Sequence, residues 1–83
     1  MNTLAMIETR LKNTFHPVFL TVDDESDQHI GHAGHQGGGR HFSIIISAAE
    51  LNGLSRVAAH RKIYAALGEL MQRSIHALRI EIR

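Results

Sequence analysis

The absence of cysteine is the feature that most constrains how this chain can fold. A chain of 83 residues closes a single hydrophobic core, and a core of that size is only marginally stable. Without thiols, the chain cannot reinforce this core with a disulfide or with a metal site built from its own thiolates. We therefore expect one domain over residues 1–83, in which every amphipathic segment is needed for folding.

Apolar periodicity predicts a two-layer α+β domain. The predicted elements are, in order, a helix at 3–14, strands at 18–22 and 41–47, a helix at about 56–72 and a strand at 77–82. Asn2 or Thr3 can cap the first helix, and Ser55 can cap the second. The first two strands are expected to form an antiparallel hairpin, and the second helix crosses over to a parallel third strand. This αββαβ order places both helices on one face of a three-stranded mixed sheet.

The same periodicity predicts which side chains are buried. In the strands, the side chains expected to face the helices are Val18, Leu20, Val22, Phe42, Ile44, Ile46, Leu78, Ile80 and Ile82. In the second helix, the predicted apolar stripe is Ile63, Ala66, Leu67 and Leu70, with Val57, Tyr64 and Met71 at its flanks. The opposite face of the sheet is not strongly apolar, so we expect it to contact solvent.

A long loop separates the first two strands. Residues 24–40 are too polar and too rich in glycine to continue a buried strand. They contain His29, His32 and His35, and the run at 37–39 is three glycines, which can take backbone angles closed to other residues. A loop of this length in so small a domain is often functional, and we expect it to be mobile or shaped by a ligand.

Composition argues against several classes of function. The formal charge of +1, with seven histidines counted as neutral, is too even to indicate nucleic-acid binding by itself. No apolar run is long enough to span a membrane, and the N-terminus lacks the pattern of a secretory signal, so we expect a cytoplasmic protein. We find no nucleophile–base pair, phosphate-binding loop or zinc-hydrolase motif, so we do not expect an enzyme.

Several segments together resemble the BolA family. They are His16-Pro17-Val18-Phe19-Leu20-Thr21-Val22-Asp23-Asp24-Glu25-Ser26, the loop of histidines and glycines, His41-Phe42, the helical His60-Arg61…Tyr64-Ala65-Ala66-Leu67, and Ile75-His76-Ala77-Leu78. They cover nearly the whole chain in the family's order. One departure is Ala59, where the family usually has an arginine before the His-Arg pair, and this change removes a basic group. Within these segments, His41 is expected to shape the start of its strand rather than to bind metal.

The resemblance implies a fold similar to the second type of KH domain and a partnership with monothiol glutaredoxins. In such complexes a [2Fe–2S] cluster is shared: the glutaredoxin and a glutathione supply thiolates, and the BolA protein supplies nitrogen ligands. The family's ligand positions map onto His76 and onto a loop residue that is Cys in some members and His in others. Counting back from His41-Phe42 places this loop ligand at His32, with His35 as the alternate. The protein is then expected to be a monomer alone and a heterodimer with the glutaredoxin.

Histidine chemistry agrees with this assignment and also leaves alternatives open. Two imidazoles can replace two thiolates on one iron, as in Rieske centres. However, His76 has the strand parity of Leu78, so it can instead be a hydrogen-bonded histidine at the edge of the core. His32 can be a solvated loop residue, and the triplet His29, His32 and His35 can bind Zn²⁺ loosely without any protein partner.

A basic cluster near the start of the second helix indicates another function. The cluster consists of Arg56, His60, Arg61 and Lys62. This cluster can contact phosphates. The resemblance to the BolA family, some of whose members are described as transcriptional regulators, then implies a DNA-binding regulator with a KH-like fold. The alternative to a nucleic-acid site is that these basic residues form an ordinary solvent-exposed face of the helix. The Gly-x-x-Gly spacing at 31–34 gives little support, because a KH domain needs that loop between two helices and here it lies between strands.

Overall fold

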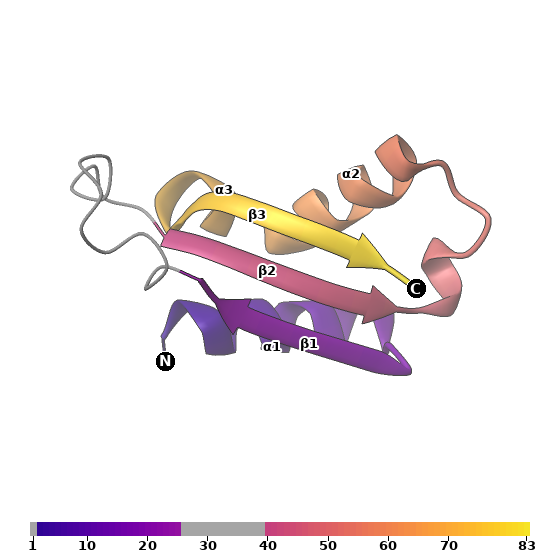
Figure 1. Ribbon diagram of the computed structural model, residues 1–83, viewed down its shortest axis with the longest axis horizontal. Coiled ribbons are helices and arrows are strands. Elements are labelled where there is room, and N and C mark those ends of the chain that lie inside the picture. Colours follow the sequence, from indigo (N-terminus) through magenta and orange to yellow (C-terminus); the bar gives the residue numbers. More distant parts are fainter. Residues whose placement is uncertain (1, 26–39) are drawn as a thin grey trace.

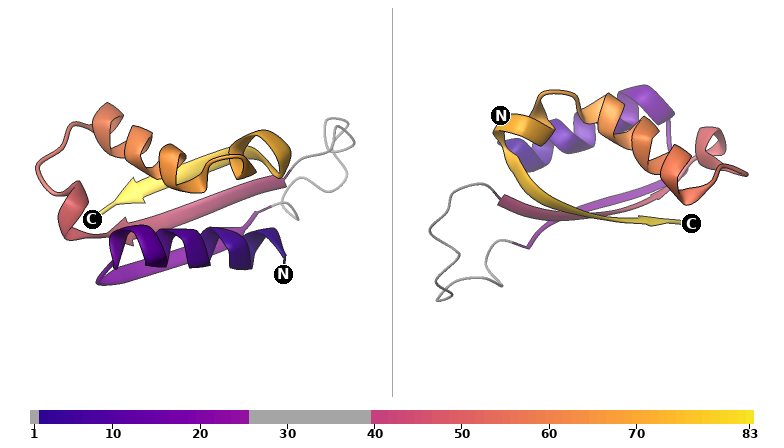
Figure 2. Two further views of the ribbon diagram at one scale, coloured as in Figure 1. Left: turned by 180° about the vertical axis from the view of Figure 1, so that it is seen from behind. Right: turned by 90° about the horizontal axis from the view of Figure 1, so that it is seen from above.

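A three-stranded sheet and a layer of helices make up the part of the chain that the computed structural model describes, residues 2–25 and 40–83 (Figure 1). The elements are α1 (Thr3–Phe15), β1 (Phe19–Asp24), β2 (Arg40–Ser47), the 3₁₀ helix η3 (Ala49–Leu51), α2 (Arg56–Leu67), α3 (Leu70–Arg73) and β3 (Ile75–Ile82). The α-helices lie on one face of the sheet, and the described residues leave the other face uncovered (Figure 2). The predicted two-layer α+β architecture is confirmed.

The strands are ordered β1-β2-β3, so that β2 is central. β1 and β2 pair in antiparallel orientation, from Phe19 opposite Ser47 to Asp24 opposite Phe42. β2 and β3 pair in parallel, and the connection between them runs through η3, α2 and α3. Both the predicted hairpin and the predicted parallel crossover are therefore confirmed.

β1 and β3 each extend by two residues beyond a predicted end, and β2 begins one residue early, at Arg40. β1 begins at Phe19 and continues through Asp23 and Asp24, whose exposed side chains stay hydrated while their backbone pairs with β2. β3 begins earlier than expected, at Ile75, because this side chain is buried and its backbone already pairs with β2. Val18, which alternation predicts to face the core, precedes the strand and is 85% exposed.

The core lies between the sheet and the helices. The side chains of Ile7, Leu11 and Phe15 form one stripe of α1, whose first turn is capped by the Asn2 side chain accepting from the Ala5 amide. The largest fully buried side chains are Phe42, Ile7, Leu11, Ile44, Ile46, Ile63 and Leu67. None of the helices in the described part of the chain is long and apolar enough to cross a membrane.

The buried stripe of α2 differs from the predicted one. Its buried residues are Ala59, Ile63 and Leu67, whereas Val57 and Tyr64 are 60% and 40% exposed. Residues spaced by about one turn share a helix face, so position 59 faces the core together with Ile63. The departure from the family pattern at Ala59 therefore lies in the core, where the alanine packs beside Ile63 and brings no basic group.

The second predicted helix is interrupted. In place of one helix over 56–72, α2 ends at Leu67 and a separate α3 follows, with Gly68 at a φ of 55° between them. Glycine reaches such angles without the steric cost that a side chain brings. The Arg10 guanidinium of α1 lies at this break and donates hydrogen bonds to the Leu67 carbonyl (2.9 Å) and the Glu69 carboxylate (2.5 Å). A carbonyl that the end of α2 would otherwise leave without a helical partner is thereby satisfied.

The pair of Arg10 and Glu69 is expected to make stability depend on pH in acid. Hydrogen bonding to the Arg10 guanidinium lowers the pKa of Glu69 from 4.5 to about 2. Because the folded-state pKa is depressed, the pair stabilises the fold above a pH of about 4.5, and this contribution is lost as the pH falls towards 2. Both side chains are partly exposed, so salt weakens the effect.

We expect Glu69→Gln to have a lower thermal midpoint than the wild type at neutral pH, because the amide removes the charged pair. The difference should shrink continuously below a pH of about 4.5 as the wild-type carboxylate becomes protonated. Thermal unfolding followed by circular dichroism at several pH values measures both midpoints. A difference that stays constant down to a pH of about 2 would contradict the prediction.

Candidate functional site

An irregularity in β3 falls at the residue that the sequence marks as a ligand. The pairing of β2 with β3 passes from Arg40 opposite Ile75 to His41 opposite Ala77, so His76 is an extra residue in β3. Such a β-bulge re-aims the side chains around it. His76 and Ala77 are both exposed, and alternation towards the core resumes only after them. The alternative interpretation of His76 as a histidine at the edge of the core is therefore wrong.

The ring of His41 lies beside the ring of His76. Their centroids are 5.2 Å apart and the rings are tilted by 48°. Because Phe42 faces the core, the half-buried His41 before it points to the open face of the sheet. The sequence predicts that His41 shapes the start of β2, but it does not predict the contact with His76. Strict alternation in β3 would place the His76 side chain on the opposite face of the sheet from His41.

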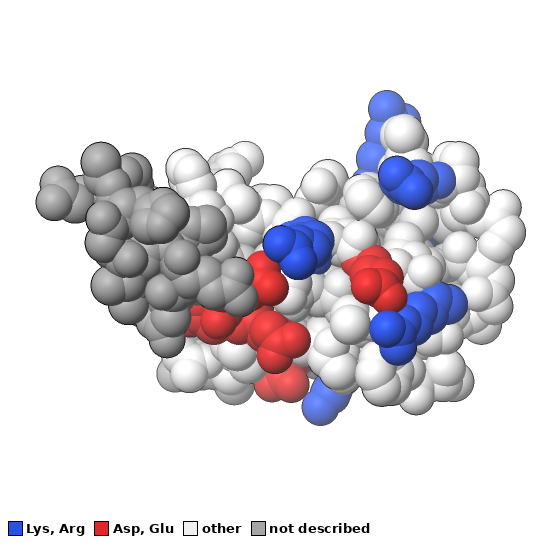
Figure 3. Space-filling model, in the orientation of Figure 1, with Lys and Arg blue, Asp and Glu red and all other residues white. Residues whose placement is uncertain are grey.

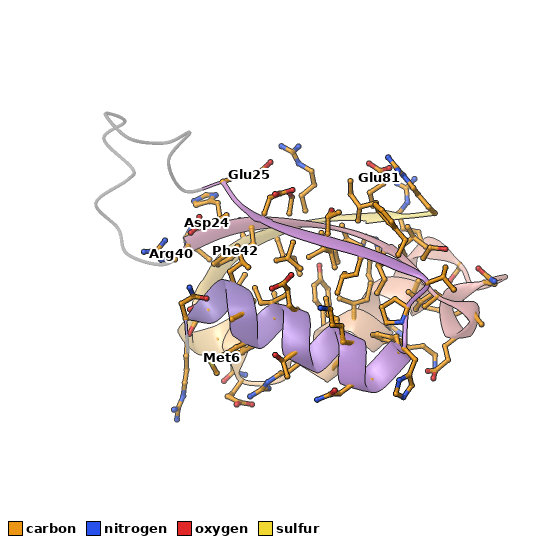
Figure 4. The ribbon with its side chains drawn as sticks, turned by 90° about the horizontal axis from the view of Figure 1, so that it is seen from below. Met6, Asp24, Glu25, Arg40, Phe42 and Glu81 are labelled. Carbon is orange, nitrogen blue, oxygen red and sulfur yellow. The ribbon has the colours of Figure 1, made fainter. Side chains whose placement is uncertain are left out.

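Hydrogen bonds and ion pairs tie together the strand ends around the two histidines. The Glu25 amide donates a hydrogen bond to the His41 carbonyl (2.8 Å), and the Glu25 carboxylate lies 3.8 Å from the Arg79 guanidinium. At the same end of the sheet, Arg40 pairs with Asp24 at 2.7 Å (Figure 4). Acidic side chains gather at this end of the open face (Figure 3). Asp24 and Glu25 are thus each paired with an arginine at this end of the sheet.

The described residues alone do not complete a metal site. No group of three or more His, Cys, Asp or Glu side chains within residues 2–25 and 40–83 is arranged to hold a metal ion. The chain also has no cysteine. A metal centre beside His76 would need further ligands from the rest of the chain or from a partner.

The histidines of the long loop, His29, His32 and His35, lie outside the described residues, so their predicted roles stay predictions. The residues that flank the loop are described. Glu25 and Arg40 both lie at the end of the sheet that carries the His41 and His76 rings. The described chain therefore stops at Glu25 and resumes at Arg40, both at the end of the sheet where His76 lies.

The structure does not bring the basic cluster onto one surface. Arg56 and His60 line a hollow of about 530 Å³ between α2 and β3. Lys62 lines a different groove, between α2 and α1, and Arg61 is exposed. The His60 ring also packs edge-on against the Tyr64 ring, with centroids 6.3 Å apart. Arg56 and His60 therefore lie on a different side of α2 from Lys62.

The turn between α2 and α3 joins two helices, and a KH domain carries its phosphate-clamping loop between two helices. Its sequence is Gly68-Glu69-Leu70-Met71, which has one glycine and not the Gly-x-x-Gly pattern. The Glu69 carboxylate at this turn is paired with Arg10. A carboxylate at the turn is unfavourable for a phosphate backbone, so the turn does not favour nucleic-acid binding of the KH kind.

A comparison with models of protein families identifies the family of this chain. The model of the family described as BolA-like protein matches residues 11–83. This chain belongs to the BolA family. The resemblance read from the histidine, glycine and helical segments is confirmed, and BolA structures share its fold. BolA1 from Arabidopsis thaliana is similar with a TM-score of 0.83 and 32% sequence identity, over 100% of this chain and 92% of that one.

The match to this chain covers different shares of the length of its BolA relatives. The DNA-binding transcriptional regulator BolA of Haemophilus influenzae is 33% identical over 82 residues, which are 99% of this chain and 77% of the relative. BolA-like protein 1 of Bos taurus is 35% identical over 79 residues, which are 95% of this chain and 56% of the relative. The chain thus spans little more than half of the bovine protein. These relatives are named as a regulator or as BolA-like, and neither name describes an enzyme.

Proposed function

We propose that this BolA-family chain is a non-enzymatic adaptor that co-ligates a [2Fe–2S] cluster with a monothiol glutaredoxin and glutathione. His76 and a loop histidine, His32 or its alternate His35, would supply nitrogen ligands, while the partner and glutathione would supply thiolates. The observation that carries the proposal is the bulge of β3, which leaves the His76 side chain exposed beside His41. The adaptor would act in the cytoplasm, in iron–sulfur trafficking or iron sensing.

The donor chemistry fits a cluster shared between two proteins. A cysteine-free chain offers imidazole nitrogens, and the two described rings at this end are too few to hold a cluster alone. The bound cluster would supply a redox-active iron centre with less negative charge than one held by four thiolates. Within this chain, the bulge fixes the backbone of His76, and the neighbouring His41 ring limits where the His76 ring can turn.

The proposal is tested by titrating this protein into a monothiol glutaredoxin that carries a [2Fe–2S] cluster, in the presence of glutathione. Visible absorption and circular dichroism are followed, because replacing thiolate by imidazole changes the ligand-to-iron charge-transfer bands. We expect a new spectrum that saturates at one chain per cluster, together with a complex on gel filtration. An unchanged spectrum with no complex at any ratio would reject the adaptor function.

The alternative function is DNA binding, which the name of the Haemophilus influenzae relative supports. It requires the exposed Arg61 and Lys62 to contact phosphates, although Lys62 and Arg56 lie on different sides of α2. A DNA-binding function predicts an affinity for duplex DNA that falls steeply with salt and that drops again in the Arg61→Ala variant. The adaptor function predicts that Arg61→Ala leaves the spectral titration unchanged, so this variant separates the two functions.

A further inference from the structure

β3 is an edge strand of the described sheet, and its outer side pairs with no other described strand. Among the described strands, β2 is the only neighbour of β3 in the sheet. The Arg83 amide donates a hydrogen bond to the Ile46 carbonyl of β2, so the odd-numbered residues of β3 point their backbone groups inward. Backbone groups alternate along a strand, and those of Leu78, Ile80 and Ile82 therefore point to the outer edge. Such a row of donors and acceptors is a template for another strand.

We propose that this edge pairs with the same edge of a second copy of the chain, in antiparallel orientation about a two-fold axis through Ile80. In this register Leu78 lies opposite Ile82 of the second copy, and Ile80 lies opposite its own counterpart. Each of these residue pairs exchanges two hydrogen bonds, because all the residues involved point their backbone groups outward. The two sheets would join into one continuous sheet with the helices of both copies on one face.

Charge complementarity selects a second copy and this register. Arg79 and Glu81 alternate with the apolar residues and lie exposed on the open face, where within one chain Arg79 pairs with Glu25 at 3.8 Å and Glu81 with Arg83 at 2.8 Å. With the axis at Ile80, Arg79 of each copy lies opposite Glu81 of the other, which gives two cross-strand pairs of opposite charge. An axis at Arg79 or at Glu81 would place like charges opposite each other. Charges of one sign protect a strand edge against pairing with a second copy, because like charges then face each other. This edge carries charges of both signs, which can pair.

Shape on the helix side agrees with the same occupant. Next to β3 there is the hollow of about 530 Å³, lined on the strand side by Ile80, Glu81 and Ile82 and on the helix side by the apolar Leu51, Leu54 and Ala59 together with Arg56 and His60. In Figure 1, α2 lies on the side of β3 that faces away from β2. An added strand would carry its own Leu78, Ile80 and Ile82 counterparts beneath α2. The apolar side chains of these residues would fill the hollow and would thereby be removed from contact with water.

The bulge limits the pairing and keeps it apart from the histidine site. Regular alternation in β3 begins only after Ala77, so His76 lies outside the paired segment. In the antiparallel dimer the two His76 residues are separated by eight residue steps along the strands, or roughly 26 Å. Each copy could therefore bind its own glutaredoxin. This dimer departs from the monomer expected from the sequence.

Charge reversal tests the dimer without touching the core. Sedimentation velocity of the full chain is measured over a wide range of concentration, where we expect a reversible increase from the mass of one chain to twice that mass. Arg79→Glu and Glu81→Arg should each weaken association about tenfold, because each places like charges opposite one another. An equimolar mixture of the two variants should associate again, since all its cross-strand pairs are opposite in charge. Lys12→Glu on α1, with the same change in charge as Arg79→Glu, should associate like the wild type.

Amide hydrogen exchange tests the position of the interface. We expect the Leu78, Ile80 and Ile82 amides to become more protected as concentration rises. The Arg79 and Glu81 amides point to β2 and should be protected at every concentration, which makes them the control within the same strand. A single-chain mass throughout, association that ignores both charge reversals, or even-numbered amides that exchange independently of concentration would each overturn the proposal. Capture of a foreign peptide by this edge in place of a second copy would also overturn it.

Discussion

Replacing His76 with alanine is expected to abolish the spectral response of a [2Fe–2S]-loaded monothiol glutaredoxin to this protein. The side chain is exposed at a bulge near the start of an edge strand, so its loss should change the free energy of unfolding by no more than about 0.5 kcal/mol. If the spectral response is then lost, the cause is the loss of a cluster ligand, because the variant remains folded. The measurement is the visible circular dichroism titration, with thermal unfolding of each variant as the test of folding.

Matched histidine variants make this prediction specific. His60→Ala removes an imidazole on α2 that packs against Tyr64, and it should respond like the wild type. His41→Ala removes the ring beside His76 without removing the proposed ligand, so it should weaken the response about tenfold and leave its final spectrum unchanged. His32→Ala and His35→Ala, compared separately, identify the loop ligand. A His76→Ala variant with the wild-type spectrum and affinity would contradict the ligand role.

Replacing Ile63 with alanine is expected to lower the free energy of unfolding by about 3 kcal/mol. Ile63 is fully buried on α2, where it packs in the core between the sheet and the helices. A domain of this length has a total stability of roughly 4–12 kcal/mol, so the loss is a large share of what holds it together. Urea unfolding followed by far-ultraviolet circular dichroism, at low protein concentration, measures the change.

Val57→Ala is the matched control for the cavity that the Ile63→Ala substitution leaves in the core. It shortens another β-branched residue of the same helix, but Val57 is 60% exposed. We expect its free energy of unfolding to stay within about 0.5 kcal/mol of the wild type. Equal losses for the two variants would mean that helix propensity, and not burial in the core, determines how much α2 contributes.

Local pattern predicted the elements but not the two places where the chain departs from regular structure. Periodicity found α1, the hairpin and the crossover because the apolar residues of each element repeat with its own period. Gly68 alone does not predict a helix end, because an isolated glycine inside a helical pattern is tolerated at modest cost. What fixes the break is Arg10, more than fifty residues earlier, which donates to the Leu67 carbonyl. No local pattern contains that contact.

The candidate site was predictable only in part, for a similar reason. His76 was singled out by the family resemblance, while its strand parity indicated the core. The bulge that exposes it depends on how the start of β3 pairs with β2, which is a property of two strands and not of one. His41 becomes a neighbour of His76 through the same pairing. The loop histidines lie outside the described residues, and their assignment still rests on the sequence.

The contact between Arg10 and the end of α2 also bears on where this domain can be cut. The family match starts at residue 11, inside α1, so a fragment trimmed to that boundary would lack Arg10 and the fully buried Ile7. It would keep every residue of the histidine site but leave the Leu67 carbonyl without its donor and open a gap above the sheet. The folded domain therefore includes α1 and its Asn2 cap, although the family model matches only from residue 11.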